Sequence, residues 1–219
     1  MRTRKGALDP VAGFFGKSWG RKDGVLPPDP ALPNDPTLPA LPLHTDWAWR
    51  PAPWTSDRLV DGGAARSGGE IAPGAKLFHD DRAADILLDW GAFDRPPFAL
   101  RIAVGSFAGS FLSLALDLPA DGVRGLRRRQ ILRAETRVDA PGTPEIYLRL
   151  NIRHGANTER LPQSIQPNLP QVAEFDLFHS PFFEGAVEAV WLDLIVTAPT
   201  PGRIVIGDLV LSRRPRPEI

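Results

Sequence analysis

Apolar and polar residues alternate along much of the chain between positions 98 and 212. In the clearest segment, 146–153, one face would carry Ile146, Leu148, Leu150 and Ile152, and the other Tyr147, Arg149, Asn151 and Arg153. A period of two residues is typical of a β-strand that is buried on one side only. The pattern predicts a strand with a hidden aliphatic face and an outer face bearing an aromatic ring and charges.

The same alternation, interrupted by proline and glycine, predicts further strands along the chain. We expect them at residues 70–71, 76–79, 86–90, 99–104, 110–118, 131–138, 146–153, 172–178, 187–196 and 203–212. The only helix expected is short and covers residues 122–130. Because strands and helices do not alternate, a doubly wound parallel sheet is excluded. The predicted fold is an all-β, antiparallel, jelly-roll-like β-sandwich.

A proline-rich stretch divides the chain. Seven prolines lie within residues 27–42, and proline is incompatible with a helix or with an interior strand. We therefore expect two parts: residues 1–42, a basic, proline-rich extension or linker, and residues 43–219, the β-sandwich domain. The extension is predicted to be irregular.

Charge and composition exclude several classes of function. Lysine and arginine number 26, aspartate and glutamate also number 26, and the formal net charge is zero. Such a chain lacks the positive field of a nucleic-acid binder. The absence of cysteine rules out disulfides and thiolate chemistry. We expect no transmembrane segment, because no apolar run is long enough. Since Asp9 and Pro10 interrupt any signal core after the basic start, we also expect a cytoplasmic protein.

Two parts of the sequence resemble known protein families, and both resemblances bear on the expected fold. Residues 202–211 resemble the closing strand of galactose-binding-like and carbohydrate-binding jelly rolls. Over residues 43–216 the chain resembles a domain-of-unknown-function family of alphaproteobacterial proteins. The segments that carry this second resemblance are 46–51, 78–80, 110–114, 150–155, 157–159, 191–195 and 212–216. The resemblance implies a bacterial domain of this architecture and implies no particular reaction.

The polar face of segment 146–153 is the leading candidate site. An aromatic ring such as that of Tyr147 stacks on sugars, while arginine and asparagine side chains hydrogen-bond to hydroxyl groups. We predict non-catalytic binding of a glycan or other polar small molecule by Tyr147, Arg149, Asn151 and Arg153, with His154 and Asn157 at the rim. The alternative is a solvated face whose arginines pair with acids such as Glu135 across the sheet.

A second interpretation concerns Trp47, Trp49 and Trp54, which lie within eight residues of one another. They are predicted to form either an aromatic platform or a structural strap whose indoles plug one end of the sandwich. As a platform, they would favour a structural or interaction module that docks a protein partner through residues 1–54.

A third interpretation is a glycoside-active enzyme. Glu174 and Asp176 would lie on one face of a strand, roughly 7 Å apart, which suits acid–base work on a glycosidic bond. The segment resembles the Glu-x-Asp-x-x-Glu strand of a sandwich glycosidase family, but His179 replaces the last glutamate, so catalysis is not expected. The four histidines lack metal-ligand spacing. We expect no cofactor, although a structural calcium ion is compatible with the fold and cannot be located from the sequence.

Overall fold

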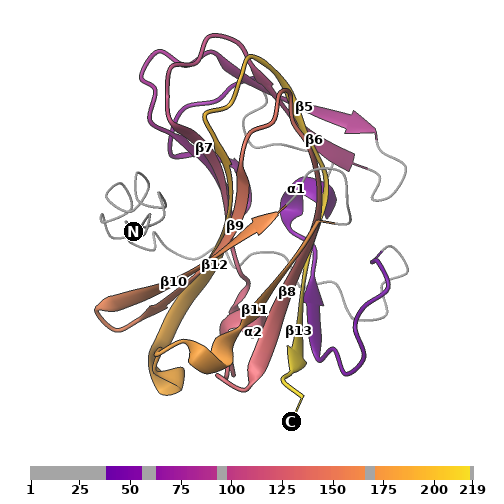
Figure 1. Ribbon diagram of the computed structural model, residues 1–219, viewed down its shortest axis with the longest axis vertical. Helices are drawn as coiled ribbons and strands as arrows, with labels where there is room; N and C mark the ends of the chain where they lie inside the picture. The colour runs from indigo at the N-terminus through magenta and orange to yellow at the C-terminus, as the bar shows by residue number, and fades with distance from the viewer. Residues whose placement is uncertain (1–37, 56–62, 93–97, 166–170, 218–219) are drawn as a thin grey trace, which may run out of the picture.

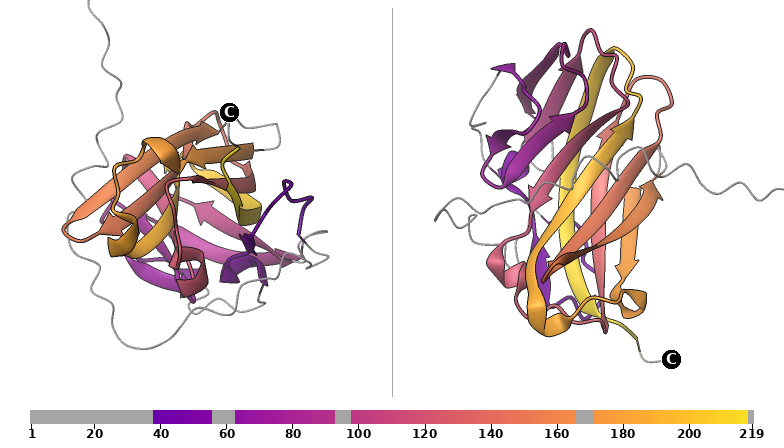
Figure 2. Two further views of the ribbon diagram at one scale, coloured as in Figure 1. Left: turned by 90° about the horizontal axis from the view of Figure 1, so that it is seen from below. Right: turned by 90° about the vertical axis from the view of Figure 1, so that its left-hand side faces the viewer.

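The computed structural model describes residues 38–55, 63–92, 98–165 and 171–217. Two antiparallel sheets pack face to face (Figures 1 and 2). Sheet A contains, in spatial order, β11 (Gln171–Asp176), β8 (Gln130–Asp139), β13 (Gly202–Pro215), β6 (Phe98–Val104), β5 (Ile86–Ala92) and β2 (Gly63–Ala64), with β1 (Trp47–Trp49) paired to the far end of β13. Sheet B contains β10 (Asn157–Ile165), β9 (Ile146–His154), β12 (Val187–Thr197), β7 (Phe111–Asp117), β4 (Ala75–His79) and β3 (Gly69–Ala72).

The chain crosses repeatedly between the sheets, so neighbouring strands are often far apart in the sequence. This arrangement confirms the predicted jelly-roll-like sandwich. Helical structure in the described ranges is limited to α1 (Ala52–Thr55), α2 (Ala120–Val123) and two 3-10 turns, η1 (Leu177–His179) and η2 (Glu184–Ala186). No helix in those ranges is long and apolar enough to cross a membrane.

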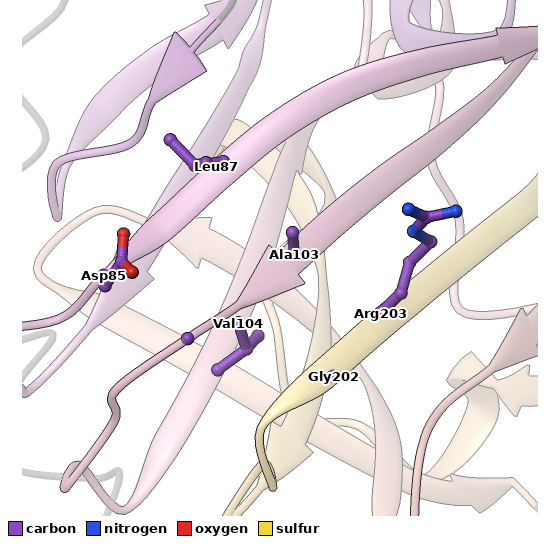
Figure 3. A pocket seen from close by; sticks show the side chains of 7 residues that line it. Asp85, Leu87, Ala103, Val104, Gly202 and Arg203 are labelled. Carbon is purple, nitrogen blue, oxygen red and sulfur yellow. The ribbon is translucent and has the colours of Figure 1, made fainter.

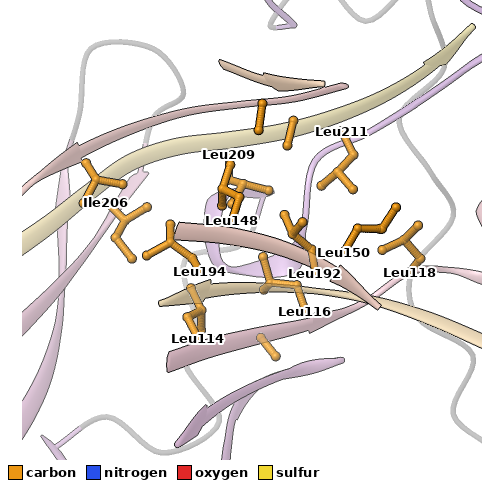
Figure 4. Packing of buried hydrophobic residues seen from close by; sticks show 14 of the residues in the cluster. Leu114, Leu116, Leu118, Leu148, Leu150, Leu192, Leu194, Ile206, Leu209 and Leu211 are labelled. Atoms are coloured by element: carbon orange, nitrogen blue, oxygen red, sulfur yellow. The ribbon is translucent and has the colours of Figure 1, made fainter. Parts of the chain in front are cut away.

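The core lies between the sheets and is built by the inward half of each alternating strand (Figure 4). On sheet B the inward side chains include Leu114, Leu116, Leu148, Leu150, Leu192 and Leu194, each 0 or 1 % exposed. The facing side chains of sheet A include Ile206, Leu209 and Leu211. The alternation read from segment 146–153 therefore gives the correct inner and outer faces of β9.

A β-bulge interrupts β13. The register of β13 against β8 shifts between Ile206 and Asp208. Ile206 and Leu209 both point into the core, although they are three positions apart, because the extra residue resets the two-residue period. The bulge keeps both halves of this long strand buried on the same side.

The segment that carries the three tryptophans, here called the strap, is buried. Trp47, Trp49 and Trp54 are 6, 3 and 0 % exposed, so none offers a ring to a ligand. The segment is attached at the β13 bulge: Trp54 Nε1 donates to the Ile206 carbonyl at 2.9 Å. The nearly buried Arg50 guanidinium donates to both carboxylate oxygens of Asp208 at 2.9 and 3.0 Å. Such a bidentate pair holds the strap in one orientation.

Two local predictions were wrong. The helix expected at 122–130 is a single turn, α2, because Gly125 adopts a left-handed φ of 74° and the chain leaves the helix before β8 begins. Strand β10 was not predicted, since Pro162 was read as a breaker. Pro162 is accommodated because β10 is an edge strand, where a missing backbone donor does not break an interior ladder. Of the predicted extension, residues 1–37 lie outside the described residues.

Candidate functional site

The outer face of sheet B gathers aromatic and charged side chains from four adjacent strands. Antiparallel register places Arg149 of β9 opposite Asp193 of β12, and Asn151 opposite Trp191. Trp191 in turn lies opposite Asp117 of β7. This face includes Lys76, Phe78, Phe111, Ser113, Asp117, Tyr147, Arg149, Asn151, Arg153, Trp191, Asp193 and Ile195.

At the centre of this face is a buried polar network. Arg149 Nε and Nη2 donate to Asp193 Oδ2 at 3.1 and 2.8 Å, and Asn151 Nδ2 donates to the same oxygen at 2.8 Å. Arg149 is 8 % exposed, Asn151 1 % and Asp193 0 %. Burial raises the pKa of Asp193, while the Arg149 guanidinium opposes that shift. The network joins β9 to β12 at the middle of the face, and Arg149 and Asn151 have little surface left to touch a ligand.

The partly exposed side chains surround this network. Tyr147 and Trp191 are aromatic, whereas Lys76, Asp117 and Arg153 are charged. Tyr147 Oη donates to Glu145 Oε2 at 2.5 Å, and this hydrogen bond raises the pKa of the tyrosine. Its ring packs against a small apolar cluster on this outer face, formed by Phe111 and Ile195 with Phe78 beside them. The Tyr147 ring therefore lies outside the core, as the sequence predicted.

His154 and Asn157 do not join this face, contrary to the rim position expected for them. A strand alternates its faces, so the residue after Arg153 points the other way. His154 is 3 % exposed, with Nε2 3.2 Å from Glu159 Oε1 and its ring 5.7 Å from that of Phe183. Asn157 is exposed and is paired with His154 in register, so its side chain follows the same, opposite side of the sheet.

Sequence reasoning missed Trp191, Asp193, Asp117 and Lys76 as members of the site. The alternation of β7 and β12 does place these residues on outer faces. In β12, however, Ala189 and Ile195 lie on the same face as Trp191 and Asp193, so the sequence alone makes this face look apolar. Only the strand order, with β9, β12, β7 and β4 side by side, shows that these residues share a surface with Tyr147.

Asp117 should make stability depend on pH. Burial raises its pKa to about 6 from 3.8, while Lys76 opposes the shift. Because the folded value is the higher one, the contribution to stability is fully present below pH 3.8 and is lost as the pH rises through about 6. Between about pH 4 and about pH 8, we expect wild type to lose up to roughly 3 kcal/mol relative to Asp117→Asn. Urea unfolding of both proteins at both pH values measures this difference, and parallel pH profiles would contradict it.

The carboxylates of the enzyme interpretation lie on the other sheet, and both are engaged by arginines. Asp176 Oδ2 accepts from Arg216 at 2.9 Å, and Glu174 lies 3.3 Å from Arg214 and 3.7 Å from Arg133. Although burial opposes it, the hydrogen bond from Arg216 lowers the pKa of Asp176. The pairing with Arg216 keeps Asp176 ionised. A catalytic role for Glu174 and Asp176 stays a prediction.

The acidic turn at Asp80 and Asp81 has a structural explanation. Asp80 accepts from the Ser110 amide and hydroxyl at 2.7 and 2.6 Å, and Asp81 accepts from the Ala108 amide at 2.7 Å. Both carboxylates therefore hold the loop before β7. Across the ranges that the structure describes, no group of three or more histidine, aspartate or glutamate side chains is arranged to hold a metal ion.

A shallow hollow lies at one end of sheet A (Figure 3). It measures about 470 Å³ and is lined by Asp85, Leu87, Ala103, Val104, Gly105, Gly202 and Arg203. Its lining has no aromatic ring and only two charged side chains, those of Asp85, just before β5, and Arg203 of β13. It is a poorer candidate for recognition of a polar ligand than the outer face of sheet B.

Comparison with protein families gives one match: the model described as "Family of unknown function (DUF6478)" covers residues 33–219. No curated protein matches the chain. Among solved structures, the chain is similar to the enzymatically active domain of tailspike protein 4 from bacteriophage CBA120, with a TM-score of 0.45 and 9 % identity. That match covers 63 % of this chain and only 19 % of the tailspike chain.

Two carbohydrate-binding modules are also similar in fold. A family 11 module from Clostridium thermocellum, in complex with a β-1,3-1,4-mixed-linked tetrasaccharide, gives a TM-score of 0.43 and 13 % identity over 68 % of this chain and 95 % of the module. The CBM22-1 xylan-binding domain from Paenibacillus barcinonensis gives 0.40 and 7 % identity over 75 % of this chain and 100 % of the domain.

Proposed function

We propose that this chain, which belongs to the family of unknown function DUF6478, is a non-catalytic binding protein whose ligand is a glycan. The ligand would lie across the outer face of sheet B. The observation that carries the proposal is the pair of partly exposed rings, Tyr147 and Trp191, on either side of the buried network of Arg149, Asp193 and Asn151.

The spacing of the two rings suits an extended ligand. Tyr147 and Asn151 are four residues apart along β9, which is roughly 13 Å. Trp191 lies next to Asn151 on β12. Two rings this far apart on one face can each stack on a different sugar unit of one chain.

Charged side chains near Tyr147 and Trp191 supply the hydrogen-bonding groups that a glycan site needs. Lys76, Asp117 and Arg153 are partly exposed there and provide both donors and acceptors for hydroxyl groups. Underneath, the Oδ1 atom of Asn151 and the Oγ atom of Ser113 are buried and have no hydrogen-bond partner among the described residues. Unsatisfied buried polar atoms are costly, and they are more common at functional sites than in a purely structural surface.

A glycan array followed by titration calorimetry with the strongest glycan tests the proposal. Wild type should bind, and Tyr147→Ala and Trp191→Ala should each lower the affinity by roughly tenfold or more, because a stacked ring contributes about 1–2 kcal/mol. Tyr147 is a cleaner probe than Arg149, since replacing the buried Arg149 also changes stability.

Two variants on sheet A serve as matched controls. Leu87→Ala removes an exposed apolar side chain, and Arg101→Ala removes an arginine whose ion pair with Asp89 is long, at 3.7 Å. Both should bind the glycan as wild type does. If no glycan on the array binds wild type, or if the ring variants match the controls, the proposal fails.

A further inference from the structure

One end of the sandwich exposes two phenylalanine rings. Phe183 is 68 % exposed and Phe178 41 %, and both lie in the connection between β11 and β12 that contains η1 and η2. This connection lies at the end of the molecule that also carries α2 and the C-terminus (Figure 1). Two large apolar side chains exposed in one surface connection make it a candidate for a contact with a partner or a membrane.

A basic loop lies against the same turn. Arg124, Arg127, Arg128 and Arg129 are all exposed in the segment that joins α2 to β8. Arg128 ties the two segments together: its Nη2 donates to the Phe178 carbonyl at 2.8 Å, and its amide donates to Glu184 Oε1 at 2.7 Å.

Among the described residues of this end, arginines outnumber the carboxylates that pair with them. Arg127 forms a long ion pair with Glu184, at 3.8 Å, whereas Arg128 contacts Glu184 only through its backbone amide. The guanidinium of Arg216 lies 4.8 Å above the Phe178 ring and is neutralised by Asp176. We call Arg124, Arg127, Arg128, Phe178 and Phe183 together the basic-aromatic end.

We propose that the basic-aromatic end docks on an anionic phospholipid surface. Phenylalanine rings on a projecting turn can enter the boundary between headgroups and acyl chains, while neighbouring guanidinium groups bind lipid phosphates bidentately. Each arginine near an anionic membrane surface adds to the attraction. The Arg128 hydrogen bonds hold the arginine loop beside the connection that carries the two phenylalanines. A single membrane contact can therefore involve both. The inference is independent of glycan binding, because the rings lie outside the outer face of sheet B.

Vesicle co-sedimentation of the full chain tests the inference. The probes are vesicles of phosphatidylcholine alone and of phosphatidylcholine mixed with phosphatidylserine. Wild type should bind the mixed vesicles, and raising the salt concentration should weaken the binding. Phe178→Ser combined with Phe183→Ser should lower the bound fraction at least tenfold, as should Arg124→Gln combined with Arg127→Gln. The controls are Leu87→Ser and Arg101→Gln on sheet A, which should bind as wild type does.

Circular dichroism and thermal unfolding of each variant establish that the loss does not come from misfolding. Equal sedimentation with both kinds of vesicle would overturn the inference, as would wild-type binding by the phenylalanine variants. An absence of binding by wild type, together with capture of an acidic polypeptide such as polyglutamate through the same arginines, would assign the end to an acidic protein partner instead.

Discussion

Arg149→Ala is expected to lower the free energy of unfolding by roughly 3–5 kcal/mol, the range for removing one partner of a buried ion pair. The substitution leaves the carboxylate of Asp193, which is 0 % exposed, with only neutral donors, the Asn151 amide and the Trp191 side chain. A buried carboxylate without its cation must take up a proton or remain charged in an apolar setting, and both are unfavourable. Urea unfolding with an unchanged m-value measures the loss.

A double variant separates two contributions to stability: the cost of leaving Asp193 buried without its cation, and the net stabilisation by the Arg149–Asp193 ion pair. Arg149→Leu with Asp193→Leu removes both charges, and it should recover much of the stability that Arg149→Ala loses. Arg101→Ala removes an exposed ion pair and should change the unfolding free energy by less than about 0.5 kcal/mol. If Arg149→Ala is as stable as Arg101→Ala, the network is not what holds the middle of the face.

The second large effect is expected at the strap. Trp54→Ala should cost roughly 3–5 kcal/mol, as truncation of a buried tryptophan usually does. The Trp54 side chain is 0 % exposed, and its Nε1 donor satisfies the Ile206 carbonyl at the β13 bulge. Removing the indole leaves a cavity between the strap and sheet A and a carbonyl without that partner. Guanidinium unfolding followed by tryptophan fluorescence from the remaining indoles measures the change.

Trp54→Phe divides the effect into packing and hydrogen bonding. It keeps most of the buried ring but loses the donor, so it should cost about 1–3 kcal/mol, the penalty for an unsatisfied buried carbonyl. Leu87→Ala, at a side chain 49 % exposed, should be nearly neutral and serves as the control for loss of an apolar group. Equal stability of Trp54→Ala and wild type would show that the strap does not anchor the domain.

The fold could be predicted from the sequence wherever the two-residue alternation of apolar and polar residues determines which side chains are buried. Segment 146–153 has strict alternation, and β9 buries Ile146, Leu148, Leu150 and Ile152 as that alternation requires. Prediction failed where the local structure depends on which strand lies alongside. Pro162 is tolerated only because β10 has an open edge, and the bulge after Ile206 is visible only in the register with β8.

The candidate site was partly predictable for the same reason. Tyr147, Arg149, Asn151 and Arg153 follow from one strand. Their partners on β12 and β7 depend on strand order, which periodicity does not encode. Asp193 illustrates the difference: its charge pairs with an arginine 44 positions away in the chain, on a strand that lies beside it only after folding. His154 was wrongly expected beside Arg153, because neighbouring residues of a strand point to opposite faces of the sheet.

The attachment of the strap to β13 also sets an order of events during folding. Trp54 and Ile206 are 152 positions apart, and Arg50 and Asp208 are 158 positions apart. During synthesis, the segment at 47–54 must therefore wait until nearly all of the following strands have emerged before its indoles can be buried. Contacts this distant form slowly, because the intervening loop has to be closed first. Until β13 is in place, those rings lack the strand on which they are buried.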